Sequence, residues 1–187
     1  MIRFFVREAS PCCYKVRLLL SMLSLRYESV TVDAMDPCPV PTTPFVPFEK
    51  QPLIEDEALR LHNAEAILTY LARKYDRFGT WLPDDARATG LIAQWLSFAS
   101  GELTRLGNST SRSEEAALHF LNEHLTNRKW LELDRPTIAD VSCYPSVAHA
   151  QAAGFDLTPV PFVLEWLERF RSMPGFVTDC TSGSRVS

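Results

Sequence analysis

Patterns typical of β-strands are confined to the first third of this chain, and helical patterns alone follow. Strand-like segments rich in β-branched and aromatic residues, or in short apolar runs, occupy residues 2–6, 26–33, 52–55 and 58–61. Beyond a joint at residues 78–83 that contains glycine and proline, apolar residues recur at helical spacing. The chain is therefore predicted to combine an α/β half with an all-helical half.

The first half alternates strands and helices. A helical pattern begins at Pro11, which suits a first helical turn, and it places Leu19 and Leu23 on one face. A second helix is predicted over residues 64–75, with Asn63 as its N-terminal cap. The order is β-α-β-loop-β-β-α, and a right-handed crossover makes the first two strands parallel.

Six prolines interrupt the chain between the second and third predicted strands. They stand at positions 37, 39, 41, 44, 47 and 52. Because proline lacks a backbone donor and fixes its own φ, this density excludes both a helix and a central strand. We expect a connection here, ordered or mobile, instead of a regular element.

The second half contains four predicted helices. Asp84 and Asp85 open the first of them, which carries apolar residues as far as Leu103. Thr137 with Asp140 forms a capping-box variant that starts the third helix, which runs to about His149. The second and fourth span residues 114–125 and 161–171. The sequence predicts two domains, at residues 1–76 and 84–178, joined by a linker at residues 77–83. A flexible tail is predicted at residues 179–187.

Charge and composition exclude several classes of protein. With 19 Lys and Arg against 23 Asp and Glu, the net charge of −4 does not favour binding to nucleic-acid backbones or acidic membranes. No apolar run approaches the roughly 18 residues of a membrane helix, and early charges interrupt any signal-peptide core. Five cysteines, two of them adjacent, make a poor disulfide framework. We expect a cytoplasmic protein that binds neither nucleic acid nor a membrane.

Four motifs follow one another in an informative order. Residues 10–17 read Ser-Pro-Cys-Cys-Tyr-Lys-Val-Arg, and residues 47–55 read Pro-Phe-Glu-Lys-Gln-Pro-Leu-Ile-Glu. Residues 61–71 and 134–140 contain Asn-Ala-Glu-Ala-Ile and Arg-Pro-Thr-Ile-Ala-Asp. Together they resemble the glutathione S-transferase superfamily. The resemblance implies an α/β thioredoxin-like N-terminal domain, an all-α C-terminal domain and an enzyme that uses glutathione.

Ser10 is the residue that the resemblance places beside the sulfur of glutathione, as in the serine-type theta and delta classes. A hydroxyl at a helix N-terminus can donate to a thiolate, and the helix dipole favours its ionisation. A plainer interpretation is that Ser10 only caps the helix. Cys12 and Cys13 are alternative thiols, but the reactive cysteine of thiol-based relatives precedes the proline, where this chain has Ser10. Cys13 is expected to be buried and inert.

The resemblance also implies ligand contacts around Gln51 and Pro52. The peptide bond between them is expected to be cis, and the backbone of Gln51 is expected to pair with the ligand like an added strand. Lys50 could meet the glycine carboxylate of glutathione, or it could be an ordinary solvated lysine.

Asn63 and Ala64 depart from the family pattern at the γ-glutamyl end of the site. That pattern has glutamate or glutamine followed by serine, so a hydroxyl is missing here. The helix N-terminus still favours an anion, but losing one hydrogen bond to a charged group costs about 1.5 to 3 kcal/mol. Glu65 in the first turn is expected to repel the ligand carboxylate further. Glutathione should therefore bind weakly.

A second departure concerns the pocket for the acceptor substrate. The chain already turns at residues 106–113, where the family has long helices, so the pocket should be unusually open. Trp95, Phe98 and Leu103 are candidates for its floor, although apolar residues at helical spacing are more often core. The spacing of the histidines contains no zinc motif, and no metal site is expected.

Three functions remain open from the sequence. The first is conjugation or isomerisation of a small hydrophobic electrophile with glutathione, by a protein that could form a homodimer. The second is an isomerase, cyclase or dehydratase of the same fold that no longer needs glutathione, which the sequence Asn63-Ala64-Glu65 favours. The third is a non-catalytic interaction module. A glutathione titration with and without Ser10→Ala separates them best.

Overall fold

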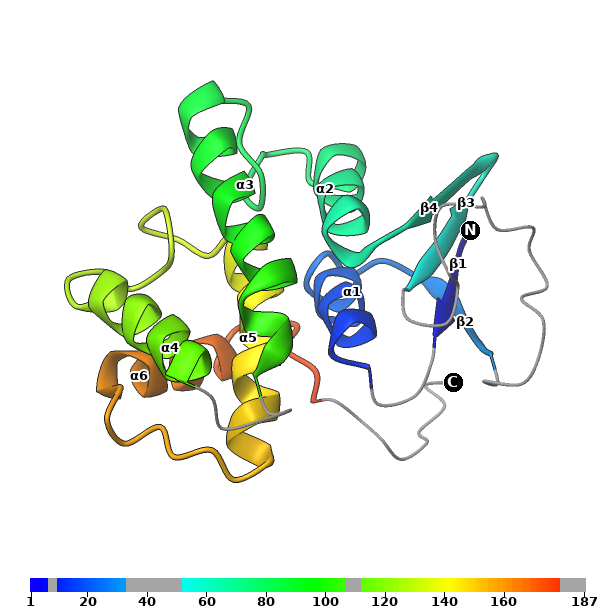
Figure 1. Cartoon of the computed structure of the whole chain (residues 1–187). Coiled ribbons are helices and arrows are strands. Elements are labelled where there is room, and N and C mark those ends of the chain that lie inside the picture. Colours follow the sequence, from blue (N-terminus) through cyan, green and yellow to red (C-terminus); the bar gives the residue numbers. More distant parts are fainter. Residues whose placement is uncertain (7–9, 33–51, 107–111, 179–187) are drawn as a thin grey trace.

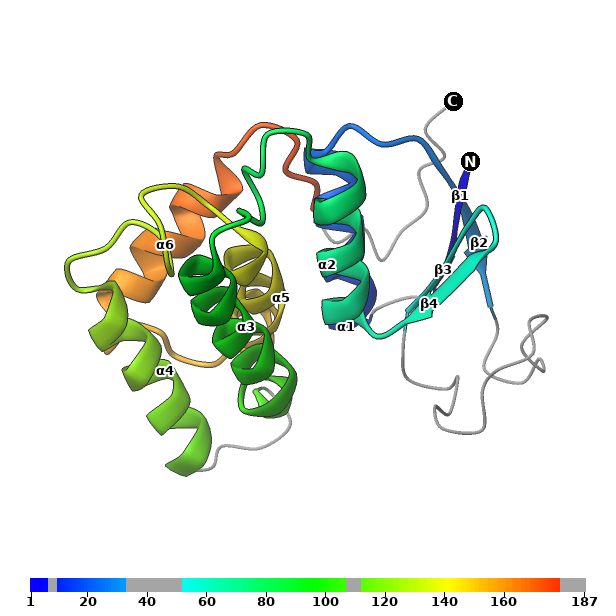
Figure 2. The ribbon, with the colours of Figure 1, turned by 90° about the horizontal axis from the view of Figure 1, so that it is seen from above.

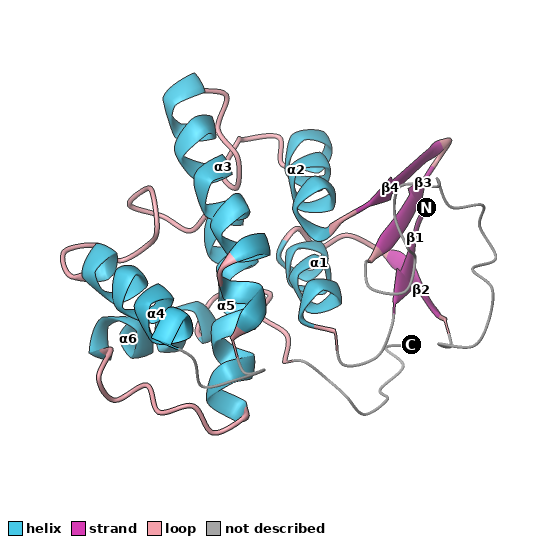
Figure 3. Cartoon of the chain, viewed as in Figure 1, coloured by secondary structure: helices cyan, strands magenta, loops and turns pink. Residues whose placement is uncertain are grey.

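The computed structural model of the chain describes residues 1–6, 10–32, 52–106 and 112–178. Its strands are β1 (Ile2–Val6), β2 (Tyr27–Thr31), β3 (Leu53–Asp56) and β4 (Leu59–His62). Its helices are α1 (Pro11–Met22), α2 (Ala64–Tyr75), α3 (Ala86–Gly101), the short 3-10 helix η2 (Leu103–Arg105), α4 (Arg112–Leu125), α5 (Ile138–Ala152) and α6 (Pro161–Arg171). Figure 3 shows the labelled strands before α2 and helices after it. The predicted fold class is confirmed.

The elements lie in successive layers (Figure 1). The sheet is at one side, α1 and α2 cover one of its faces, α3 and α5 pack next, and α4 and α6 lie farthest from the sheet. The view from above shows the same order, with α1 and α2 between the sheet and the other helices (Figure 2). The two halves of the chain therefore meet where α1 and α2 pack against α5.

The sheet has the strand order β2-β1-β3-β4. β1 runs parallel to β2, with Phe4 opposite Ser29, as the right-handed crossover predicts. β3 is antiparallel to β1, with Ile54 opposite Phe4, and β4 returns along β3 as the second strand of a hairpin. α1 follows the central strand β1 in the chain, and α2 follows the edge strand β4, which lies beside β3.

Alternation along the strands divides the sheet into two faces. Phe4 and Ile54 pack into the main core with the apolar residues of α1 and α2. Phe5 and Leu53 point to the opposite face, where they cluster with Val32. A row of alternating charges crosses that opposite face through Glu28, Arg3, Glu55 and Arg60.

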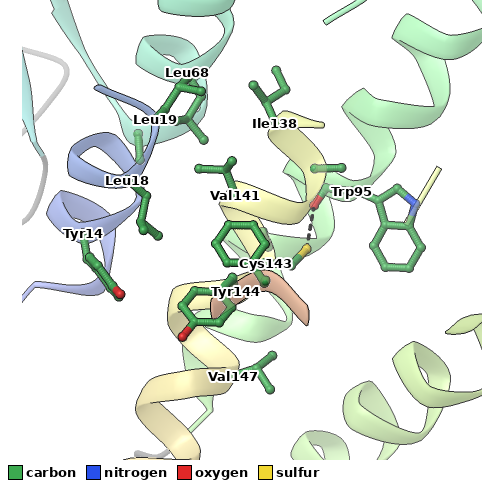
Figure 4. Packing of buried hydrophobic residues seen from close by; sticks show 14 of the residues in the cluster. Tyr14, Leu18, Leu19, Leu68, Trp95, Ile138, Val141, Cys143, Tyr144 and Val147 are labelled. Atoms are coloured by element: carbon green, nitrogen blue, oxygen red, sulfur yellow. Dashed lines mark hydrogen bonds between the residues drawn. The ribbon is translucent and has the colours of Figure 1, made fainter. Parts of the chain in front are cut away.

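α5 is the helix on which the two halves pack, and its apolar side chains point to both sides (Figure 4). Toward α1, Tyr144 meets Tyr14 with their ring centroids 6.3 Å apart, and Val141 lies in the same interface. Toward α3, the Cys143 thiol contacts the carbonyl oxygen of Trp95 at 3.9 Å. Because these side chains are buried, α5 holds α1 and α2 in fixed positions.

The predicted capping box at the start of α5 is confirmed. Thr137 Oγ1 accepts from the Ala139 N–H at 3.2 Å, and the Asp140 carboxylate accepts from the Thr137 N–H at 2.9 Å. Asp140 also accepts from the Leu131 N–H at 3.1 Å and from Trp166 Nε1 at 3.0 Å. Burial raises the pKa of Asp140 to about 6, although these hydrogen bonds work to lower it. The box thus ties α5 both to the preceding turn and to α6.

Two helix ends differ from the sequence prediction. A single helix was predicted through Leu103, but α3 ends at Gly101 and a 3-10 turn follows. α5 continues through Pro145 to Ala152, past the predicted end near His149. Proline removes one hydrogen bond of the helix, and burial of α5 on two sides compensates for it. Among the described residues, no helix is both long and apolar enough to cross a bilayer.

Candidate functional site

Ser10 lies immediately before α1, as its N-cap residue. Its backbone is extended, with φ −95° and ψ 119°, and its carbonyl oxygen accepts from the Tyr14 N–H at 3.0 Å. Its half-buried side chain makes no capping hydrogen bond, unlike the caps of α2, α3 and α5. The hydroxyl is therefore not committed to the helix.

Cys12 and Cys13 lie in the first turn of α1 but in different surroundings. Cys13 is 4% exposed and packs in the main core. Cys12 is partly buried, and its burial raises the pKa of the thiol. The charge of Lys15 lowers that pKa, whereas the charge of Glu65 adds to the increase. The net effect disfavours the thiolate form of Cys12, which is the opposite of what an activated nucleophile needs.

Asn63 caps α2 as predicted, since its Oδ1 accepts from the Ala66 N–H at 3.1 Å. Its φ of 74° lies in the left-handed region, which asparagine tolerates better than most residues and which is often found at functional sites. The Ile67 N–H is the first to pair with a helix carbonyl, that of Asn63. The N–H groups of Ala64 and Glu65 precede this ladder and can face an anion.

Glu65 requires a correction to the sequence analysis, which treated its carboxylate as a charge that repels the ligand. Glu65 Oε1 lies 2.8 Å from Lys15 Nζ of α1, and Ser142 Oγ of α5 donates to the same oxygen at 3.2 Å. The side chain of Lys15 is 1% exposed and that of Glu65 14%. The charge of Glu65 is thus compensated by an ion pair, and removing it would leave a buried lysine without its partner.

Sequence reasoning missed Lys15 and His62, both of which lie next to the predicted site residues. Lys15 stands four residues before Leu19 on the buried side of α1, and a lysine at an apolar helix position was the available signal. His62, the last residue of β4, has a buried Nδ1 that finds no hydrogen-bond partner among the described residues, and burial lowers the pKa of its imidazole. No pattern in the sequence marks His62.

The predicted residues at the other end of the site can be placed only in part. Lys50, Gln51 and the Gln51–Pro52 peptide bond lie outside the described residues, as do the six-proline connection up to residue 51 and the tail from residue 179. Pro52 itself is buried, immediately before β3. Its neighbour Leu53 pairs with Phe5 of β1 and with His62 of β4.

The three candidates for the floor of the acceptor pocket lie in the helical half. Leu103 is fully buried and Trp95 is 5% exposed, so of the three only Phe98 offers much surface to a ligand. The Trp95 ring packs against Phe98, Phe120 and His124, with centroids 4.7 to 5.9 Å away. The assignment of this floor stays a prediction.

Two surface cavities of about 470 and 450 Å³ lie in the helical half, away from Ser10 and Asn63. Their linings include Ala88 with Arg135 and Leu118 with Phe155, respectively. In the described part of the chain, no three His, Cys, Asp or Glu side chains gather in a way that could hold a metal ion.

Comparisons with known proteins agree with this architecture. A family model described as the glutathione S-transferase N-terminal domain matches residues 4–80, and the model of the C-terminal domain matches residues 108–174. The chain is 28% identical over 178 positions to Glutathione S-transferase D7 of Anopheles gambiae, covering 86% of this chain and 81% of that protein. It is also 28% identical over 193 positions to the Disulfide-bond oxidoreductase YfcG of Escherichia coli strain K12, covering 88% of each.

Solved structures agree as well. A crystal structure of a possible glutathione S-transferase from Rhodopseudomonas palustris superposes with a TM-score of 0.82 at 28% identity, covering 96% of this chain and 97% of that one. The two family models, the relatives and this likeness extend over both halves of the chain. The chain therefore belongs to the glutathione S-transferase superfamily.

Proposed function

We propose that this glutathione transferase-like enzyme joins the sulfur of glutathione to a small hydrophobic electrophile, with Ser10 as the residue that stabilises the sulfur as a thiolate. The observation that carries the proposal is the junction of α1 and α2. An ion pair between Lys15 and Glu65 ties the N-terminal parts of the two helices together, with Ser10 before one helix and Asn63 before the other. Two helix N-termini side by side provide a positive potential for a tripeptide with an anionic sulfur and an anionic end.

The residues at the junction of α1 and α2 are assigned different roles in the proposed reaction. Glutathione supplies the thiol, which loses its proton to solvent, and the resulting thiolate attacks the electrophile. The new C–S bond forms by addition to a polarised double bond or by displacement of a leaving group, which is the halide ion for an aryl halide. Ser10 donates a hydrogen bond from its hydroxyl, which does not cap the helix, to the sulfur, and this hydrogen bond lowers the pKa of the glutathione thiol. The N–H groups of Ala64 and Glu65 favour the γ-glutamyl carboxylate. The fit is incomplete, because Ala64 offers no hydroxyl, and binding should accordingly be weak.

We further infer an acceptor that is small and apolar, in an open cleft to which Phe98 contributes surface. A cytoplasmic location and a homodimer complete the proposal. The absence of a basic surplus, with a net charge of −4, supports a small-molecule partner over nucleic acid.

The test combines calorimetric titration of glutathione with a rate assay on a model aryl halide. Ser10→Ala should lower the glutathione-dependent rate by about ten- to a thousandfold, as expected for the loss of one donor aimed at developing charge. Cys12→Ser is the matched control and should retain most of the activity. Loss of activity in Cys12→Ser with activity retained in Ser10→Ala would refute the assignment and favour thiol chemistry.

Thiol–disulfide exchange is the second candidate, and one relative named as a disulfide-bond oxidoreductase motivates it. Cys12 would be the residue to react, since it is the more exposed of the two adjacent cysteines. Its raised pKa counts against this role, because a protonated thiol is a poor nucleophile. The missing hydroxyl at Ala64 also favours an enzyme of the same fold that works without glutathione. A parent protein that binds no glutathione but still turns over a hydrophobic substrate would support that alternative.

A further inference from the structure

A buried three-residue cluster joins the two halves of the chain beside the proposed glutathione site. Lys15 of α1, Glu65 of α2 and Ser142 of α5 meet at one carboxylate oxygen, Glu65 Oε1, at 2.8 Å from the amine and 3.2 Å from the hydroxyl. Lys15 and Ser142 are almost completely buried, and Glu65 is mostly so. We name this set the Lys15–Glu65–Ser142 cluster.

Stability alone is a weak reason for such a cluster. Removing two charges from water costs several kcal/mol per ion before their attraction is counted, and well-packed apolar residues of similar size are often as stable or more stable. Lys15 lies among apolar neighbours of α1 that would accommodate such a replacement. The position of the cluster suggests another reason, because Lys15 lies five residues after Ser10 and Glu65 lies in the first turn of α2.

We propose that Lys15 and Glu65 are positioning residues of the glutathione site, which hold the first turn of α2 against α1 and cancel each other's charge beside the α2 N-terminus. This inference rests on the proposed function of that site. Lys15 makes it possible for a glutamate to stand in the first turn of α2 without repelling an anion, and Ser142 fixes the carboxylate from the side of α5.

Neutralising Lys15 and neutralising Glu65 should have opposite effects on the affinity for glutathione but the same effect on stability. Lys15→Met leaves the negative charge of Glu65 uncompensated next to the α2 N–H groups, so an anionic ligand is repelled. Glu65→Gln leaves the positive charge of Lys15 uncompensated at the same place, so an anionic ligand is attracted. Either change breaks a buried pair and destabilises the fold.

The experiment measures the dissociation constant of glutathione by calorimetry and the melting temperature for each variant. Lys15→Met should weaken binding by about tenfold or more, since one unit charge a few ångströms away is worth at least that factor. Glu65→Gln should bind at least as tightly as the parent, and the double variant Lys15→Met/Glu65→Gln should return close to the parent affinity. Both single variants should melt at a lower temperature than the parent, whereas the double variant, which leaves no unpaired buried charge, should melt close to the parent.

Two matched controls separate charge from loss of stability. Asp56→Asn disturbs a buried carboxylate at the far end of α2, so it should lower the melting temperature without changing the dissociation constant. Ser142→Ala removes one hydrogen bond of the cluster but keeps the ion pair, so it should weaken glutathione binding by less than Lys15→Met does. If Lys15→Met and Glu65→Gln both lose affinity in step with their melting temperatures, as a purely structural pair would, the inference is wrong.

The Cys12 thiol provides a readout that does not need glutathione, because it senses both charges. The midpoint of its alkylation against pH should rise in Lys15→Met and fall in Glu65→Gln, and equal midpoints would overturn the inference even if the site binds glutathione. A parent that binds no glutathione while these midpoints shift in opposite directions would instead refute the proposed function and the ligand part of this inference, and leave the compensated charge pair established.

Discussion

Replacing Asp140 by alanine tests how the start of α5 is held. The carboxylate of Asp140 is the shared acceptor for the N–H groups of Leu131 and Thr137 and for the indole of Trp166. Asp140→Ala leaves these three buried donors without an acceptor, at roughly 1 to 3 kcal/mol each. The variant also removes a buried charge, and this relief offsets part of the loss.

The size of the offset follows from the pKa of Asp140. Burial raises that pKa from 3.8 to about 6, which corresponds to about 3 kcal/mol of unfolding free energy lost by the parent at neutral pH. The folded pKa exceeds the unfolded one, so this part of the stability is present at low pH and is lost as the pH rises through about 6. Asp140→Ala should therefore cost about 3 kcal/mol net at pH 7, or a fall of about 6 to 12 °C in Tm for a chain of this size.

The assay is urea unfolding followed by circular dichroism at pH 7 and pH 5. The parent should become more stable relative to Asp140→Ala as the pH falls, so the difference between the two proteins should widen. Asp85→Ala is the matched control, because it removes an exposed cap that accepts one hydrogen bond from the Ala88 N–H, at about 1 kcal/mol. A difference between parent and Asp140→Ala that narrows at pH 5 would refute the reasoning, since it would mean that the charged carboxylate is the stabilising form.

Two further predictions concern α2. Asn63→Gln combined with Ala64→Ser should restore the hydroxyl at the γ-glutamyl end and improve glutathione affinity by about ten- to a hundredfold by calorimetry; no gain, with a parent that already binds tightly, would show that this end of the site is intact. Asp56 accepts from Tyr70, Lys74 and Tyr75, and although burial works to raise its pKa, these bonds hold it below its usual value. Asp56→Asn should cost about 1 to 3 kcal/mol at pH 7. The difference in unfolding free energy between the parent and Asp56→Asn should shrink as the pH falls below about 4, because protonation of Asp56 removes the same contribution from the parent. A difference that stays constant with pH in urea unfolding would contradict this expectation.

Interactions between residues close together in the chain account for much of what the sequence predicted. Thr137 and Asp140 stand three residues apart, and Asn63 stands three residues before the N–H that it caps, so both helix starts depend on neighbours in the chain. The ends of α3 and α5 were predicted less well. A helix end depends on packing as much as on local signals, and burial carries α5 through Pro145.

The candidate site divides in the same way. The positions of Ser10 and Asn63 could be predicted from the sequence, because each precedes a helix whose start is determined by residues nearby in the chain. That the Ser10 hydroxyl makes no capping hydrogen bond, that His62 Nδ1 has no partner among the described residues and that Glu65 pairs with Lys15 could not be predicted, since these depend on what packs nearby.

The sequence by itself determined the two-part architecture and the starts of its helices, because hydrophobic period, caps and prolines act over a few residues. Only the tertiary structure decided the electrostatics of the site. Lys15 and Glu65 are fifty residues apart in the chain and 2.8 Å apart in the fold. Whether a charge is exposed, compensated or repelling depends on such distant partners and on their burial, and no local pattern contains that information.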